Sequence, residues 1–294
     1  MDKSLSKKVM VITGATSGIG LAAATELAGR GALVIGVGRS EERCSQAREG
    51  ILSQYPDARI EYLIADLSLQ KQVRELAAAI KSRIEKEENK TIDVLINNAG
   101  TVANWYTVTS EGFELQFAVN HLAPFLLTHE LMPAMSSSGR VIMTSSGSHY
   151  RTHMNWKDIQ LRRHYNCLMM YKQCKLANVL FAAELNRRLK NKSNIRAYAV
   201  DPGLVNTDIG LKGTYGIVRF VWKIRSRKGI EPKEAAATMV FLASLPLSEN
   251  PSDIYWKKCK PKEPSRYSMR EDVSKRLWEV SEKMCGIKSE DFGL

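Results

Sequence analysis

The chain alternates short apolar runs with longer segments that carry a helical pattern of apolar residues. The first apolar runs are "KVMVIT", "ALVIGV" and "RIEYLIA", and helical patterns follow them over 19–30, 41–54 and 69–88. Runs that are apolar throughout are typical of strands covered on both faces of a sheet. Strand–helix alternation predicts parallel pairing with right-handed crossovers. We therefore expect an α/β fold with a single doubly wound parallel sheet and helices on both faces.

The later part of the chain continues this alternation without an internal repeat or a linker. "TIDVLINN", "RVIMTSS" and "IRAYAV" are further predicted strands, with helical stretches near 122–135 and around Tyr171. We therefore predict one domain over 1–294. Long connections at 147–168 and 204–230 follow the ends of predicted strands, where open α/β sheets bind ligands. Residues of about 204–230 are predicted to form a lid over the substrate.

Composition and charge exclude several classes of protein. Hydrophobic and charged contents of 44% and 25% are ordinary for a soluble protein, and no run of eighteen apolar residues predicts a spanning helix. Five scattered cysteines without CxxC spacing fit reduced thiols in the cytoplasm, with neither disulfides nor a zinc site. We expect His149 and His153 to be exposed loop residues and expect no metal. The net charge of +12 fits a basic soluble protein, and no nucleic-acid-binding module accompanies it.

One segment leaves three alternatives open. Residues 211–229, "LKGTYGIVRFVWKIRSRKG", contain six basic residues and no acidic one, with apolar residues between them. The segment fits a lid lined by apolar groups, a patch for peripheral membrane contact that admits a lipophilic substrate, or a recognition site for an acidic substrate. The plain lid is favoured.

The first and second predicted strands end in residues that suit a dinucleotide. "TGATSGIG" places Gly14, Gly18 and Gly20 at the start of a helix, where a sharp backbone turn and free N–H groups meet a diphosphate. A tight turn without a ligand is the alternative, and the place after the first strand favours the nucleotide. The second strand ends in Arg39 rather than in the acidic residue that binds the ribose of NAD. The guanidinium matches the 2′-phosphate of NADP, and a solvated arginine is the alternative.

Further polar residues follow the remaining strands and the helix that the stretch "MYKQCKLANVLF" predicts. Tyr171 and Lys175 are four positions apart and therefore share one helix face. Ser145 and Ser146 end the fifth predicted strand, and Asn120 begins a helix. Each feature by itself has a structural alternative, because serine and asparagine also cap turns and satisfy backbone groups.

In order and spacing, these motifs resemble the short-chain dehydrogenase/reductase family from about Lys8 to Gly286. The resemblance rests on TGxxxGIG, NNAG at 97–100, the serine, YxxxK and "DPGLVNT". "VNHLAPFLLT", "CKLANVLFAAELNRRL" and "RLWEVSEKMCG" are similar to its retinol-dehydrogenase-like branch. The resemblance implies a Rossmann-type fold, NADP(H) as cofactor, an alcohol or carbonyl substrate, and a homo-oligomer as an open alternative to a monomer.

The resemblance also implies roles for individual residues. Catalysis falls to Asn120, Ser146, Tyr171 and Lys175, with Ser146 preferred to Ser145 because the family serine is usually the second of the pair. By the same resemblance, Asp66 is expected to contact the adenine, and the turn at Pro202 is expected to contact the nicotinamide. The full implied cofactor-binding set is Gly14, Thr16, Ser17, Gly18, Ile19, Gly20, Arg39, Asp66, Leu67, Asn97, Ala99, Gly100, Tyr171, Lys175, Pro202, Gly203, Val205 and Thr207.

The implied reaction is hydride transfer between NADP(H) and a lipophilic aldehyde or ketone. Tyr171 donates the proton, and the Lys175 ammonium lowers the phenol pKa from its ordinary value of about 10. Ser146 donates to the carbonyl oxygen, and Asn120 holds a water of the proton relay. Asp201 departs from the family, which commonly has histidine there, and "NPSDIYW" lacks a glycine usual in the last strand. A non-catalytic NADP(H)-binding redox sensor or regulatory protein is the rival interpretation, and the presence of all four catalytic positions favours the enzyme.

Overall fold

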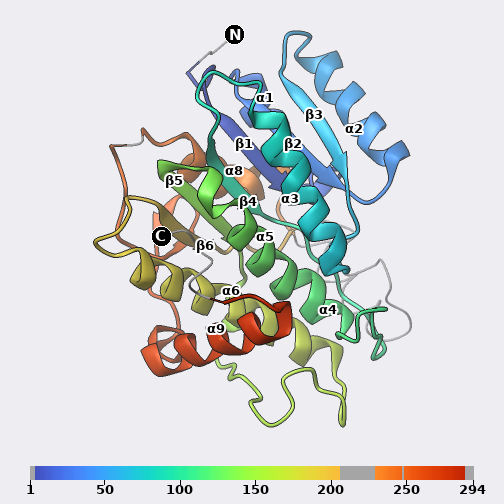
Figure 1. Cartoon of the computed structure of the whole chain (residues 1–294), viewed down its shortest axis with the longest axis vertical. Helices are drawn as coiled ribbons and strands as arrows, with labels where there is room; N and C mark the ends of the chain where they lie inside the picture. The colour runs from blue at the N-terminus through green and yellow to red at the C-terminus, as the bar shows by residue number, and fades with distance from the viewer. Residues whose placement is uncertain (1–3, 206–228, 247, 289–294) are drawn as a thin grey trace.

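The computed structural model describes residues 4–205, 229–246 and 248–288. Its centre is a sheet in the order β3-β2-β1-β4-β5-β6-β7-β8 (Figure 1). The strands from β1 to β7 pair in parallel, and β8 pairs antiparallel with β7. The strand bounds are Val9–Thr13 (β1), Leu33–Gly38 (β2), Ile60–Ile64 (β3), Ile92–Asn97 (β4), Met135–Thr144 (β5), Arg196–Val200 (β6), Tyr255–Lys257 (β7) and Lys260–Pro261 (β8). The expected doubly wound α/β sheet is confirmed.

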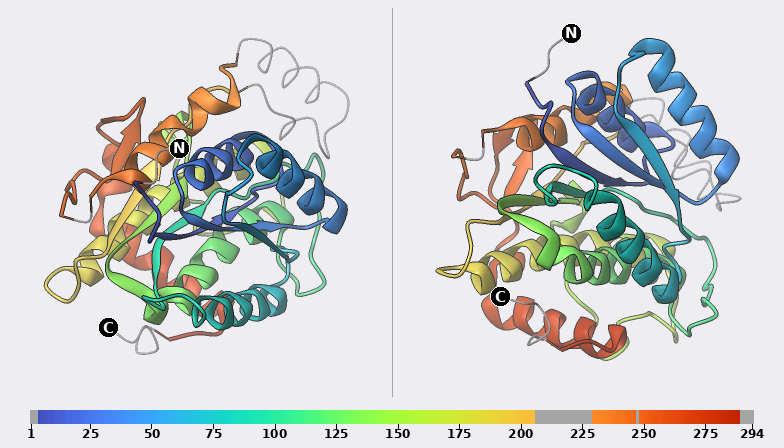
Figure 2. Two further views of the ribbon diagram at one scale, coloured as in Figure 1. Left: turned by 90° about the horizontal axis from the view of Figure 1, so that it is seen from above. Right: turned by 45° about the horizontal axis from the view of Figure 1, so that its top comes forward.

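Helices cover both faces of this sheet (Figures 1 and 2). Along β1, Val9 and Val11 pack in one core with α3, α5 and α6, whereas Met10 and Ile12 pack in a second core with α1 and α8. These opposite directions of alternate side chains explain why the strands are apolar throughout. The α-helix bounds are Gly18–Gly29 (α1), Glu41–Gln54 (α2), Gln70–Ile84 (α3), Leu115–Phe117 (α4), Ala123–Leu131 (α5), Cys167–Leu189 (α6), Pro232–Ser244 (α8) and Glu271–Cys285 (α9).

A second helical layer lies outside α6. Helix α9 packs against α6, and Figure 1 shows it across the outer side of that helix. Trp278 on α9 stacks on Phe181 with ring centroids 5.5 Å apart, and it meets the edge of Phe125 at 5.0 Å. Helix α9 thereby buries the outer side of the α5–α6 layer.

The helix expected over 122–135 begins earlier and is not regular. It comprises α4, the π-helical turn η1 (Ala118–Leu122), α5 and the short 3₁₀ turn η2 (Met132–Ala134). Pro124 explains the π-helical turn, because proline has no N–H to donate to the carbonyl of Asn120 four residues before it. Two further 3₁₀ turns are η3 (Gly147–His149) and η5 (Arg266–Met269).

The C-terminal sheet edge forms without the missing glycine. Strand β7 pairs with β6 through Tyr255 and Trp256, and the turn into β8 places Lys258 and Cys259 at positive φ angles of 52° and 56°. Most of the predicted lid (206–228), including Thr207 and nearly all of the basic segment 211–229, lies outside the described residues. Within the described parts of the chain, no helix has both the length and the apolar character that crossing a membrane requires.

Candidate active site

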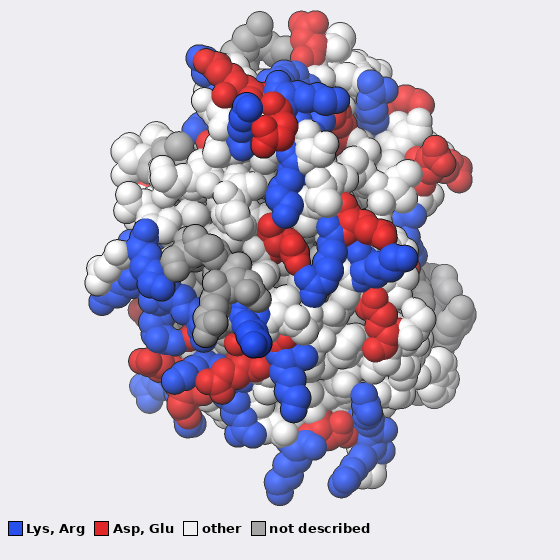
Figure 3. All heavy atoms as spheres, viewed as in Figure 1, with Lys and Arg blue, Asp and Glu red and all other residues white. Residues whose placement is uncertain are grey.

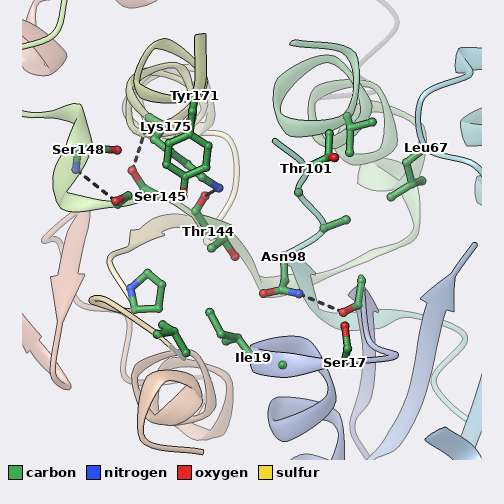
Figure 4. A pocket seen from close by; sticks show the side chains of 18 of the residues that line it. Ser17, Ile19, Leu67, Asn98, Thr101, Thr144, Ser145, Ser148, Tyr171 and Lys175 are labelled. Carbon is green, nitrogen blue, oxygen red and sulfur yellow. Dashed lines mark hydrogen bonds between the residues drawn. The ribbon is translucent and has the colours of Figure 1, made fainter. Parts of the chain in front are cut away.

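A cavity of about 990 Å³ opens at the carboxyl ends of the central parallel strands. Its walls come from the turns that follow β1, β2, β3, β4, β5 and β6 and from the start of α6, as the close view in Figure 4 shows in part. This volume is at the upper end of the range for small-molecule and cofactor sites. The cavity therefore lies at the edge where doubly wound sheets bind their ligands.

The glycine turn after β1 forms one wall because side chains do not fit there. Gly14 has a φ of +67°, and a Cβ atom there would lie 2.9 Å from Ala99 Cα. A Cβ atom on Gly20 would lie 2.2 Å from the carbonyl oxygen of Gly14, so Gly20 permits the turn without itself lining the cavity. The N-terminus of α1 follows directly and opens towards the cavity at Ser17, Gly18 and Ile19. Free N–H groups at such a helix start favour a phosphate group.

The NNAG motif contributes differently from the expectation. Asn97 does not line the cavity: its side chain is buried and its Nδ2 donates to Thr128 Oγ1 at 3.0 Å. Asn98, which sequence reasoning missed, lines the cavity and donates from Nδ2 to the carbonyl oxygens of Thr13 and Gly14 (Figure 4). The alternation of side chains along β4 sends Asn97 into the core and leaves Asn98, just past the strand, to hold the glycine turn.

Two guanidinium groups lie at the end of β2. Arg39 and Arg43 line the cavity, are exposed, and flank Ser40, whose Oγ caps α2 by accepting from Arg43 N. Among residues 4–205, 229–246 and 248–288, neither guanidinium has an acidic partner. The sequence pointed to Arg39. Arg43 was missed, although it is one helical turn from the N-cap and therefore returns to the same edge.

Tyr171 and Lys175 lie together at the opposite side of the cavity (Figure 4). Lys175 Nζ is 5.4 Å from the centre of the Tyr171 ring and donates to the carbonyl oxygen of Thr144 at 3.0 Å. The lysine is 3% exposed. Burial lowers the pKa of Lys175 to about 8, so the ammonium form dominates at pH 7 and is lost in mildly alkaline solution.

The two serines after β5 have different surroundings. Ser145 is buried, and its Oγ donates to the carbonyl oxygen of Lys175 at 2.7 Å, which fastens α6 to β5. Ser146 is half-buried, and its Oγ accepts from Ser148 N at 3.2 Å. That bond uses an oxygen lone pair and leaves the hydroxyl proton of Ser146 for a group in the cavity.

Asn120 does not line the cavity. It is 1% exposed within the π-helical turn, where its Oδ1 accepts from Thr101 N at 2.7 Å and its Nδ2 donates to Thr101 O at 2.9 Å. Both ends of the amide therefore bind the backbone of Thr101, and the water expected at Asn120 stays a prediction. Thr101 itself lines the cavity.

His149 is buried, which corrects the expectation of an exposed loop histidine. Its ring is 0% exposed, its Nδ1 lies 2.8 Å from the carbonyl oxygen of Ser146, and its Nε2 accepts from Ser265 N at 3.1 Å. Because Nε2 accepts, Nδ1 carries the proton and donates to Ser146. Burial lowers the pKa of His149, which keeps the ring neutral as this bridge requires.

Asp201 lies on the cavity wall with a cationic partner. Its Oδ2 lies 2.9 Å from Lys257 Nζ, and its Oδ1 accepts from Gly203 N at 2.9 Å. Burial opposes the charge of Asp201, but the hydrogen bonds from Lys257 and Gly203 outweigh it and hold its pKa below the ordinary value. The aspartate therefore fixes the Pro202–Gly203 turn and neutralises Lys257.

Most of the expected site residues meet in this cavity. Gly20, Asn97 and Asn120 lie outside its lining, and Thr207 lies outside the described residues. The expected residues that line it are Gly14, Thr16, Ser17, Gly18, Ile19, Arg39, Asp66, Leu67, Ala99, Gly100, Ser146, Tyr171, Lys175, Pro202, Gly203 and Val205.

Comparisons with known proteins give matches over most of the chain. A family profile described as "short chain dehydrogenase" matches residues 8–213. Retinol dehydrogenase 14 of Mus musculus is 36% identical over 95% of this chain and 86% of its own length, and retinol dehydrogenase 13 of Homo sapiens is 35% identical over 96% and 86%.

Solved structures agree with this result. A protein from Mycobacterium paratuberculosis has a TM-score of 0.75 at 30% identity, covering 96% of this chain and 95% of its own. A metagenomic short-chain oxidoreductase solved in complex with NADP has a TM-score of 0.61 at 25% identity, covering 86% and 98%.

Proposed function

The chain belongs to the short-chain dehydrogenase family, with similarity to its retinol dehydrogenases, and on that basis we propose that it interconverts a lipophilic alcohol and its carbonyl compound with NADP(H) and Tyr171 as the acid/base. The observation that carries the proposal is the meeting of Tyr171, Lys175 and Ser146 in the cavity that begins at the glycine turn. A non-catalytic NADP(H)-binding protein would not need Tyr171, Lys175 and Ser146 together in the cavity.

The residues around the glycine turn fit a dinucleotide phosphate. A Cβ atom would fill the space at Gly14, and the N-terminus of α1 supplies N–H groups for a diphosphate. Arg39 and Arg43 supply two guanidinium groups for a 2′-phosphate, which supports NADP rather than NAD. When bound, the reduced nicotinamide supplies the hydride for the carbonyl carbon.

The chain's own residues then stabilise the negative charge on the carbonyl oxygen and supply the proton that this oxygen takes up. Ser146 donates its hydroxyl proton as a hydrogen bond to the carbonyl oxygen, where negative charge develops. The Tyr171 hydroxyl gives its proton to that oxygen, and the Lys175 ammonium, 5.4 Å from the ring, stabilises the phenolate left behind. In the oxidative direction the same phenolate takes the proton from the alcohol.

Hydrogen bonds outside the reacting groups hold the walls of the cavity in position. Ser145 fastens α6 to the end of β5 through the carbonyl oxygen of Lys175, and the Asn120 amide holds the backbone of Thr101 on the facing wall. These side chains act by positioning, because their hydrogen bonds go to backbone groups of the cavity walls.

A substrate panel tests the proposal directly. Aldehydes, ketones and alcohols of rising chain length are supplied with NADPH or NADP⁺, and turnover is followed at the absorbance of the reduced cofactor. Tyr171→Phe should lower kcat at least about a hundredfold while NADPH binding changes little, because it removes the acid without touching the phosphate sites. Tyr55→Phe, a tyrosine outside the cavity, is the matched control. NADPH binding without turnover of any of these compounds would favour the redox sensor.

A further inference from the structure

The catalytic end of the cavity carries two cations that neither the fold nor the proposed chemistry uses. Arg151 follows η3, Lys172 is next to Tyr171 on α6, and both are exposed and line the cavity. In the described part of the chain, neither has an ion-pair, hydrogen-bond or ring partner for its charged group. Both charges are therefore available to a ligand.

The described acidic residues of the cavity do not neutralise this pair. Asp66 follows β3 at the far side of the cavity, where its Oδ1 accepts from Ser68 N. Asp201 is nearer, but Lys257 already occupies its Oδ2 at 2.9 Å. Arg151 and Lys172 therefore leave an excess of positive charge at the catalytic end.

The cofactor's phosphates lie elsewhere in the proposed complex. The diphosphate site is at the end of β1 and the 2′-phosphate site at the end of β2, whereas Arg151 follows β5. In the order β2-β1-β4-β5, strands β2 and β5 are three spacings apart, about 14 Å. Arg39 and Arg43 consequently serve the cofactor, and Arg151 and Lys172 face the space that remains for the substrate.

Apolar side chains accompany the two cations. Leu168 at the start of α6, Tyr150 after η3, and Leu204 and Val205 after β6 also line the cavity. The backbone of Arg151 has a φ of 55°, in the left-handed region that L-residues rarely adopt, so the fold holds this residue in an unusual conformation. A ligand that matches these walls has an apolar body and a negatively charged group.

We propose that the substrate is an amphiphilic aldehyde or ketone with an acidic group remote from its carbonyl, and that Arg151 and Lys172 bind this group. The inference rests on the proposed oxidoreductase function and narrows its substrate class. A carboxylate and a phosphate share the required chemistry, because each accepts hydrogen bonds from a guanidinium and an ammonium.

A matched pair of aldehydes tests the inference. 4-Formylbenzoate is anionic, and methyl 4-formylbenzoate is a neutral compound of nearly the same shape. With NADPH at low salt, kcat/KM should be at least about tenfold higher for the acid. The acid/ester ratio should fall about fivefold in Arg151→Gln and in Lys172→Gln, and further in the double variant and at 0.5 M salt. Lys275→Gln, an exposed lysine on α9, should leave the ratio unchanged.

A binding measurement separates the two proposals. The Tyr171→Phe variant with bound NADPH allows binding to be measured without turnover. Calorimetry on this variant compares the affinities for the acid and the ester, first alone and then with the Arg151 and Lys172 substitutions added. Tighter binding of the acid that both substitutions weaken supports the subsite, even if the wild type reduces neither aldehyde and the proposed function fails. Equal or tighter binding of the ester, or a preference that both substitutions leave intact, overturns the subsite while leaving the oxidoreductase function standing.

Discussion

Charged side chains lie at two separate sides of the cavity. Arg39 and Arg43 present two guanidinium groups at the end of β2, and the described chain offers them no acidic partner. Lys175, by contrast, is buried beside Tyr171 at the other side. The proposed function gives each of these charges a role that a single substitution can test.

Arg39→Asp should reverse the cofactor preference. We expect the affinity for NADPH to fall about tenfold to a hundredfold, because a charge-assisted bond to the 2′-phosphate is lost and a carboxylate repels it, while the affinity for NADH rises. Arg43→Gln should weaken NADPH binding alone. Cofactor fluorescence titrations measure both. Arg48→Gln on the same helix, outside the cavity, is the control, and unchanged NADPH affinity in Arg39→Asp would remove Arg39 from the site.

The pH dependence of carbonyl reduction should report Lys175. Burial lowers the pKa of its ammonium to about 8, so the positive charge that stabilises the phenolate is present below pH 8 and is lost above it. We expect kcat/KM for an aldehyde, at saturating NADPH, to fall tenfold per unit on the alkaline side with an apparent pKa near 8. Initial rates from pH 6 to 10 give the profile. A flat profile through pH 9.5 would contradict this role of Lys175.

Sequence reasoning located the residues whose role depends on backbone position better than those whose role depends on side-chain direction. Gly14, Arg39, Tyr171 and Lys175 follow strands or share a helix face, and the cavity contains all four. The side-chain directions predicted for Asn97 and His149 were wrong. Each side chain points into the protein interior, where it binds a residue far away in the sequence. Such contacts leave no mark in a local pattern.

At the scale of helices, the irregular stretch before α5 ties the cavity to the C-terminal layer. Within η1, Asn120 binds the wall residue Thr101, and the next residue, His121, lies 2.8 Å from Ser281 Oγ on α9 through its Nε2. Ser281 donates its own proton to Leu277 O, so the neutral histidine donates from Nε2. The strand–helix pattern predicted a helix here, but the π-helical turn depends on Pro124 and on this packing.

His121 should make the protein sensitive to acid. Burial lowers its pKa from 6.5 to about 4, so below pH 6.5 the unfolded chain takes up a proton that the folded chain does not. The stabilisation is present above pH 6.5 and is lost as the pH falls to 4, by about 3 kcal/mol in the free energy of unfolding. Urea unfolding at several pH values should show a smaller loss in His121→Gln than in the wild type, because the buried His149, whose pKa burial also lowers, remains in both.

The matched control for this measurement is His164→Gln, which replaces an exposed histidine. This variant should lose stability with falling pH as the wild type does, because it leaves the buried His121 in place. A wild type whose pH dependence equals that of His121→Gln would show that His121 becomes protonated without cost.

At the scale of the whole molecule, basic and acidic side chains are interspersed on the face shown in Figure 3, although the net charge is +12. The global pattern was predictable, because apolar strands in alternation with helices allow few topologies. The position of helix α9 as an outer layer on α6 was not predictable. Its amphipathic pattern indicates that one side is buried, but it does not indicate which helix covers that side.

Because the cavity walls come from six strand ends, cofactor binding should stabilise the whole sheet. A ligand at a hundred times its Kd adds about 2.7 kcal/mol to the free energy of unfolding, which raises Tm by roughly 5 °C in a chain of this size. At equal concentration NAD⁺ should give a clearly smaller Tm shift than NADP⁺, since it lacks the 2′-phosphate that we propose Arg39 and Arg43 bind. Thermal melts monitored by tryptophan fluorescence measure both shifts. The double variant Arg39→Gln/Arg43→Gln should bring the two shifts together, and equal shifts already in the wild type would contradict the assignment of the two guanidinium groups to the 2′-phosphate.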